Sequence, residues 1–514
     1  MSEQPKRSAL FENEKPAADR QGSAFMQAMQ DSSFMESMKD AQPEGSRYDE
    51  LLEQLDTEEQ QEMSSSAVKT ASGNGSGDKK LSRREKAEKA KNGSEKRSFE
   101  PIEYEDASEV SQRLKKARKR REHQLLVIGP VLFICVVLNI IAWNNSSFSL
   151  WYMQEVFPKI STLYARLTNR IPFSFGELLI QIGLWTVAVS TPLFILLMII
   201  KRKDRDFKRT VRRIYQYFYA WVLTFVLLTE TLNCFILYHT PTFVKMYDYP
   251  GKWYTPSQLE QLCDYLIAET NAAAAEVKRD KDGRFILTAD LDDTAKASMR
   301  KLAKEYPELG GWYTSPKPIK HSFFMSQQYL LGIYFPFTME ANYNDEIPKL
   351  NLPDTVCHEL AHTKGFMRED EANFIGFLAC DASESPDYRY SGYLRAMKYV
   401  IAQCEENCSE ETVARLYDSI SDEVLTDWNV NIEHWQKVQK SDEGLFDSEK
   451  VAEVSDKVSD ASMKLNGVED GKKSYDRVTD LLLDWYFMQQ EEETKGSETH
   501  ETHVVEDKDL TEVK

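Results

Sequence analysis

The apolar residues of the chain are concentrated in three runs, at residues 125–143, 178–200 and 214–238. A helix rises about 1.5 Å per residue, so the 19 residues of the first run match a hydrocarbon core of about 30 Å. Runs of this length flanked by clustered Lys and Arg are not typical of buried helices in a soluble core. The pattern therefore predicts three transmembrane helices within a membrane domain at residues 113–238.

Positive charges cluster at two places beside these runs. Residues 113–121 carry seven Lys and Arg and residues 201–213 carry eight, whereas residues 144–177 carry three. Because Lys and Arg are enriched in cytoplasmic loops, we expect the N-terminal arm and the 201–213 loop to be cytoplasmic. Three crossings then place residues 239–514 outside the cytoplasmic membrane.

The segments around the membrane domain differ from it in composition. Residues 1–112 are polar and rich in Ser, Glu, Lys and Gly, and residues 491–514 are acidic, so we expect a disordered cytoplasmic arm and a disordered tail. A β-rich patch with Gly and Pro lies at 309–345. The remaining outer portion shows helical patterning at 257–279, 354–364, 369–380, 391–404, 409–440 and 474–490. The chain is therefore predicted to be mainly α, with a small β element.

Charge and cysteine content narrow the classes of partner. The 514 residues include 64 Lys and Arg against 83 Asp and Glu, a net charge of −19. Nucleic-acid binding needs a basic face, and the basic stretches here flank apolar runs, so we expect the lipid bilayer and no nucleic acid as a partner. Seven cysteines without a CxxC pair argue against a cysteine-built metal site.

A chemically distinctive motif, His-Glu-Leu-Ala-His, lies at residues 358–362. Helical residues four apart differ by about 40° in direction and about 6 Å in height, so His358 and His362 can bind one metal ion while Glu359 projects beside it. This HExxH arrangement is typical of zinc metallopeptidases, in which the Glu takes a proton from the zinc-bound water. A Pro-Asp pair before the motif and a Gly three residues after it predict a short capped helix.

A catalytic zinc site needs a third protein ligand. In the extended HExxHxxGxxH motif this ligand is a third His, but the residue at that position here is Arg368, which excludes that class. Three acidic residues at 369–371 open a second apolar helix, and a helical hairpin would return Glu371 over the two histidines. We therefore predict Glu371 as the third ligand, with Glu369 as the alternative. The acids could instead only complement the helix dipole.

Four stretches of the chain resemble a bacterial family of membrane proteins catalogued as domain of unknown function 3810. They are IPFSFGELL, GIYFPFTMEANYN, HELAHTKGFMREDEANFIGFLAC and SYDRVTDLLL, and the resemblance runs from about residue 125 to residue 490. The shared apolar runs and the HExxH followed by Glu-Ala-Asn imply a membrane zinc peptidase. The Glu-Ala-Asn helix is also similar to the helix that supplies the glutamate ligand in gluzincin metallopeptidases, which favours Glu371.

The resemblance also bears on residues outside the HExxH motif. Tyr475 and Arg477 lie in the fourth matching stretch and are candidate catalytic residues that stabilise the oxyanion of the transition state. His321 and Tyr343 are weaker candidates for the same role. Residues 332–337 are either an edge strand that binds substrate backbone or a plain core strand.

Together these features predict a membrane-anchored zinc metallopeptidase whose zincin-like outer domain spans residues 239–490. It would bind Zn²⁺ through His358, His362 and Glu371 and hydrolyse a peptide or protein substrate with Glu359 as general base. The alternative is a non-enzymatic membrane sensor, in which the outer domain binds a ligand and the arm docks a cytoplasmic partner. Convergence of both histidines, Glu359 and a downstream acid around an open cavity would favour the enzyme.

Overall fold

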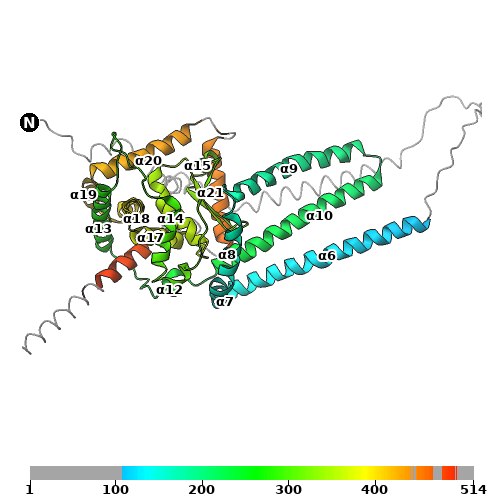
Figure 1. Ribbon diagram of the computed structural model, residues 1–514, viewed down its shortest axis with the longest axis horizontal. Helices are drawn as coiled ribbons and strands as arrows, with labels where there is room; N and C mark the ends of the chain where they lie inside the picture. The colour runs from blue at the N-terminus through cyan, green and yellow to red at the C-terminus, as the bar shows by residue number, and fades with distance from the viewer. Residues whose placement is uncertain (1–106, 442–443, 445–446, 467–476, 492–493, 495–514) are drawn as a thin grey trace, which may run out of the picture. The chain divides into compact units, whose positions relative to one another are not determined.

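The computed structural model describes residues 107–441, 444, 447–466, 477–491 and 494 (Figure 1). Most of the predicted N-terminal arm, most of the predicted acidic tail and Tyr475 lie outside the described residues. The described residues from Leu126 onward belong to one compact unit.

The first part of the described chain is built from helices. They are α6 (Ala107–Asn144), α7 (Ser146–Trp151), α8 (Phe157–Thr168), α9 (Phe175–Ile200), α10 (Arg205–Glu230), α11 (Ile236–Tyr238) and α12 (Phe243–Met246). Two π-helical segments, η2 (Tyr152–Val156) and η3 (Thr231–Phe235), join α7 to α8 and α10 to α11.

The second part adds more helices and three short strands. The helices are α13 (Pro256–Glu276), α14 (Leu291–Leu302), α15 (Phe323–Gln327), α16 (Leu352–His362), α17 (Glu369–Asp381), α18 (Pro386–Asn407), α19 (Glu410–Asp418), α20 (Asp422–Lys440) and α21 (Ser448–Leu465), with a further helix at 477–491. The strands are β1 (Lys317–Ile319), β2 (Gly332–Phe335) and β3 (Glu340–Asn344). Short 3-10 segments are η4 (Pro307–Leu309) and η5 (Lys349–Asn351). The prediction of a mainly α fold with a small β element is confirmed.

Three helical segments in the described part are long and apolar enough to cross a membrane: Leu126–Asn144, Phe175–Ile200 and Arg205–Tyr238. They correspond to the three apolar runs. The side chains of α9 face outward, as lipid-exposed side chains do, and Trp185 is 70% exposed. The Ser190 hydroxyl of α9 hydrogen-bonds the hydroxyl of a Tyr on α10 at 2.6 Å. The chain therefore associates with a lipid bilayer.

The segment between the first two membrane helices, residues 144–177, is largely helical and contributes to the main core. Met153 and Phe157 from this segment are buried. Ile236 and Leu237, at the end of the third apolar run, are buried in the same cluster as residues of the helices that follow residue 238. The hydrophobic core therefore crosses the boundary between a membrane domain and an outer domain that we predicted at residue 238.

The part of the core that follows residue 238 is a packed group of helices (Figure 1). Helix α13 packs against α18, α16 against α17, and α17 against α18. The helix at 477–491 adds Leu482 and Trp485 to this core. All seven cysteines lie among the described residues, and none of them forms a disulfide there.

The three strands form one sheet in the order β1-β3-β2. β1 is parallel and β2 antiparallel to the central strand β3, with Gly332 opposite Tyr343. β2 is thus an edge strand of the sheet within the described part of the chain. The strands fall within the β-rich patch predicted at 309–345.

Glu340, the first residue of β3, is fully buried and connects the sheet to a membrane helix. Its carboxylate accepts a hydrogen bond from Lys317 Nζ at 2.6 Å and from the backbone N–H of Gly176 at 2.7 Å. Gly176 is in the first turn of α9, where unpaired N–H groups favour a negative charge. The buried carboxylate therefore fixes the start of α9 to the sheet.

Candidate metal centre

Helices α16 and α17 form the hairpin predicted around the HExxH motif. α16 has Pro353 in its first turn, where no backbone N–H partner is required, and it ends at His362. The chain reverses at Gly365, whose φ of 102° lies in the left-handed region that favours glycine. A Cβ at Gly365 would also lie 3.0 Å from Met153 Cγ. Helix α17 then begins at Glu369.

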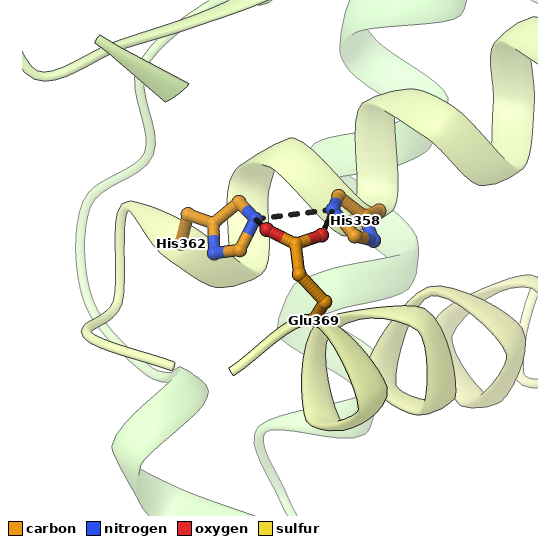
Figure 2. Close-up of side chains that lie close together, drawn as sticks. All are labelled: His358, His362 and Glu369. Carbon is orange, nitrogen blue, oxygen red and sulfur yellow. Dashed lines mark hydrogen bonds and ion pairs between the residues drawn. The ribbon is translucent and has the colours of Figure 1, made fainter. Parts of the chain in front are cut away.

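Three side chains of this hairpin converge on one point (Figure 2). The ligand atoms of His358, His362 and Glu369 lie within 4.8 Å of one another. The two Nε2 atoms are 3.0 Å apart. The carboxylate oxygens of Glu369 lie 3.3 Å from His358 Nε2 and 3.7 Å from His362 Nε2. The hairpin thus presents two imidazole nitrogens and one carboxylate to the same small volume.

A backbone contact fixes which nitrogen of His362 can bind a cation. His362 Nδ1 lies 2.7 Å from the carbonyl oxygen of Phe366. A carbonyl oxygen only accepts hydrogen bonds, so Nδ1 carries the proton and Nε2 of the neutral ring presents its lone pair to the cluster. This arrangement, with one ring nitrogen held by a backbone carbonyl and the other facing the site, is characteristic of metal-binding histidines.

Glu371, the ligand that we predicted, does not join the cluster. Its carboxylate lies 3.0 Å from Arg368 Nη1 and accepts the backbone N–H of Phe243 at 2.8 Å. Because α17 begins at Glu369, Glu371 follows it by about 200° around the helix and points to the opposite side. The alternative ligand, Glu369, therefore takes the position at the two histidines that we had predicted for Glu371.

Glu359 is buried beside the cluster, against the first residue of β2. A Cβ built on Gly332 would lie 2.4 Å from Glu359 Oε1, so only glycine leaves room for this carboxyl group. Its Oε2 atom has no hydrogen-bond partner among the described residues. Burial is the main cause that raises the pKa of Glu359 to about 8, with the Glu369 charge adding to the rise and His358 opposing it. A carboxyl group with this pKa is mostly protonated at pH 7, and a cation bound at the cluster would lower the pKa and favour the carboxylate.

The three converging groups have mutually perturbed pKa values. Burial raises the pKa of Glu369, but the hydrogen bond from His358 and the charges of both histidines outweigh it and bring the pKa to about 2. Burial lowers the pKa of His358, and the hydrogen bond and charge of Glu369 reverse this to a net rise. Burial lowers the pKa of His362 to about 4. Glu369 is therefore anionic and His362 neutral at pH 7.

These residues fit a zinc ion. Two imidazole nitrogens and one carboxylate are a donor set of catalytic zinc sites. His362 Nε2 presents a lone pair towards His358 Nε2 at 3.0 Å, so a proton or a cation must lie between the two rings. The neighbouring Glu359 oxygen is buried without a protein partner in the described part of the chain, as expected of a group that acts on a bound water.

The two predicted catalytic residues near the C-terminus have different outcomes. Arg477 Nε lies 2.8 Å from Asp370 Oδ2, so its guanidinium group is paired with the residue that follows Glu369. This contact holds the 477–491 helix against the first turn of α17. Tyr475 lies outside the described residues, and its role stays a prediction.

The two weaker candidates lie elsewhere. His321 is largely exposed, and its Nδ1 atom lies 2.6 Å from Glu177 Oε1 at the start of membrane helix α9. Tyr343 is on β3, opposite Gly332, and packs beside the smaller core cluster. His321 therefore connects its segment to α9. Tyr343 packs the sheet against the smaller core cluster.

Other residues near the cluster were not predicted from the sequence. Arg395 of α18 acts electrostatically on Glu369, and Arg395 Nε donates to Tyr399 Oη at 3.0 Å. Cys234 and Tyr238, from the end of the third apolar run, also interact electrostatically with Glu369. The sequence signal that could have found this pair is the i,i+4 spacing of Arg395 and Tyr399 on one predicted helix. The site therefore lies between α18 and the C-terminal end of the third membrane helix.

Strand β2 lies beside the cluster and at an edge of the described sheet. For residues 332–337 we had considered an edge strand that binds substrate backbone or a plain core strand, and substrate binding stays a prediction. The N–H of Asn344 donates to the carbonyl of Leu331 at 2.8 Å, so these two residues are a hydrogen-bonded pair. In an antiparallel ladder such pairs alternate with pairs that form no hydrogen bond, and Gly332 and Tyr334 belong to the second kind. The backbone groups of Gly332 and Tyr334 accordingly point away from β3, toward the edge of the sheet where no described strand pairs. Glu359 packs against Gly332.

Comparison with known proteins gives one match. A family model described as "Protein of unknown function (DUF3810)" matches residues 152–483. No curated protein and no solved structure matches the chain.

Proposed function

The chain belongs to the DUF3810 family, whose function is unknown, and from the geometry of its site we propose that it is a membrane-anchored zinc metallopeptidase. The observation that carries the proposal is the convergence of His358, His362 and Glu369 next to a buried Glu359. A site that only stabilises a fold has no need of the unpartnered carboxyl group. The β2 edge beside it, with which no described strand pairs, favours an extended peptide as the substrate.

Each residue has a distinct role in this proposal. His358, His362 and Glu369 would hold the zinc ion, which when bound acidifies water and polarises a carbonyl group. Glu359 accepts the proton of the attacking water and then delivers it to the leaving amine. Burial of Glu359 against Gly332 fixes the carboxyl group and excludes bulk water from it.

Stabilisation of the oxyanion has two sets of candidates. Tyr475 and Arg477 were predicted from the family resemblance, and Arg477 is engaged with Asp370. Arg395 and Tyr399 of α18 interact electrostatically with Glu369 and are better supported. A positively charged or hydroxyl donor facing the reacting carbonyl is the usual means of this stabilisation.

The membrane orientation is also part of the proposal. The basic residues at 113–121 and 201–213 favour a cytoplasmic location for both, which places the site on the outer side of the cytoplasmic membrane. Substrates would then be extracytoplasmic peptides or proteins.

The test is to purify the full chain in detergent and measure zinc content and peptide hydrolysis in the same samples. Glu359→Gln keeps the shape but removes the base, so zinc should stay bound while hydrolysis falls about a hundredfold. His362→Ala should lose the metal. If Glu359→Gln cleaves as fast as wild type, the mechanism is wrong. If wild type binds zinc and cleaves no peptide, the sensor function replaces the peptidase.

A further inference from the structure

A cavity opens beside the start of α16, and its lining includes Arg395, which was named above as a candidate for stabilising the oxyanion. It is lined by residues from the segment before β2, from the start of α16 and from α18, among them Leu331, Asp354, Ser391, Arg395 and Lys398. Two cationic side chains and one carboxyl group therefore face a single small volume.

The cavity adjoins the site on two sides. Asp354 lies four residues before His358, so the two side chains share one face of α16 about 6 Å apart along the axis. Leu331 precedes Gly332, against which Glu359 packs. One residue of an extended peptide spans about 3.3 Å, so a residue next to the scissile bond reaches the cavity.

The buried carboxyl group orients one of the cations. Asp354 is 2% exposed, and its Oδ2 atom lies 3.7 Å from Arg395 Nε. Its Oδ1 atom has no hydrogen-bond partner among the described residues. Arg395 Nε is also held by Tyr399 Oη at 3.0 Å. Asp354 and Tyr399 both lie close to Arg395 Nε and thus fix the guanidinium group at the wall of the cavity.

The charges of the lining favour an anion. One carboxyl group faces two cations, and Lys398 Nζ, the second of them, lies 5.4 Å from the centre of the Trp428 ring. A zinc ion nearby would add further positive charge. Guanidinium groups recognise planar carboxylates by paired hydrogen bonds, which a neutral side chain cannot reproduce.

Resting on the proposed peptidase function, we propose that this cavity binds a carboxylate of the substrate next to the scissile bond, with Arg395 and Lys398 as the recognising residues. The carboxylate can be an acidic side chain or the C-terminal carboxyl group of a short peptide. The protein would then select acidic peptides or peptides cleaved close to their C-terminus.

The experiment measures kcat/KM of the full chain in detergent with matched blocked peptides. One pair differs by Glu or Gln next to the scissile bond, and a second pair by a free or amidated C-terminus, so the two sources are distinguished. We expect a preference of about tenfold or more for the carboxylate in one of the pairs. Lys398→Met should reduce this preference severalfold, whereas Lys301→Met, a lysine on α14 outside the cavity, should leave it unchanged.

A binding measurement separates failure of the subsite from failure of the peptidase. N-acetylglutamate α-amide, which has only a side-chain carboxylate, N-acetylglutamine, which has only an α-carboxylate, and N-acetylglutamine amide, which has neither, are titrated calorimetrically into wild type and Lys398→Met. Equal cleavage within both peptide pairs refutes the subsite and leaves the peptidase standing. Absence of all cleavage, with Lys398-dependent binding of a compound that has a carboxylate and none of N-acetylglutamine amide, refutes the peptidase and leaves an anion-binding cavity. Absence of both cleavage and binding refutes both proposals. The comparison of the peptide pairs uses the wild-type protein, so its result does not depend on whether a variant folds.

Discussion

Replacing Gly332 by alanine tests whether the position of Glu359 decides activity. A Cβ at Gly332 would lie 2.4 Å from Glu359 Oε1, 2.7 Å from its Cγ and 2.8 Å from its Cδ. Carbon and oxygen atoms normally approach no closer than about 3.5 Å, so the carboxyl group must move by about 1 Å. A displacement of this size at a reacting group costs about a hundredfold in rate. Gly332→Ala should therefore lower kcat/KM by about that factor.

The same substitution should leave the metal in place. The contacts of the added Cβ are with Glu359 and not with the three converging ligands, so zinc content should equal that of wild type. Overpacking should also lower stability by about 1–3 kcal/mol, measured by denaturant unfolding. Gly183→Ala is the matched control, because a Cβ at Gly183 meets nothing within 4 Å. Unchanged hydrolysis in Gly332→Ala would refute the reasoning that this close packing positions the base.

Three further predictions follow from the contacts described above. Glu369→Ala should lower zinc affinity by about tenfold or more. Glu371→Ala should keep the metal but lose about 1–3 kcal/mol of stability, because Arg368 and the backbone N–H of Phe243 lose their carboxylate partner. Equal zinc loss in both variants would contradict the geometry. Glu340→Ala should destabilise the protein by about 3–5 kcal/mol through its buried lysine, measured as a fall in Tm, and an unchanged Tm would disprove the anchoring of α9. An impermeant thiol reagent applied to intact cells should label a cysteine introduced near Ser497 and not one near Gly93, and the reverse pattern would overturn the orientation.

Some of this molecule could be predicted from its sequence because the signal is local. The membrane helices follow from runs of apolar residues, and α16 follows from a proline before the motif and a glycine after it. The two histidines are paired by helical spacing alone. These features depend on residues within a few turns of one another.

Other features depend on contacts that no local pattern encodes. The choice between Glu369 and Glu371 depends on the residue at which α17 begins, because a shift of two positions reverses the direction of a side chain. Arg395 reaches the site only because α18 packs on α17. The helices within residues 144–177 join the core through contacts with residues far along the chain, such as the hydrogen bond from Ser161 Oγ to the carbonyl of Thr363.

The packing of the turn at Gly365 has a consequence for the order in which the protein matures. This turn separates two of the proposed zinc ligands from the third, and its glycine is in contact with Met153 and Leu237. Leu237 stands at the end of the third membrane helix, so this surface forms only when that helix has been inserted. A chain that has not reached the bilayer has no complete support for its metal ligands. The support of the ligand hairpin is thus complete only once the end of the third membrane helix has taken its folded position.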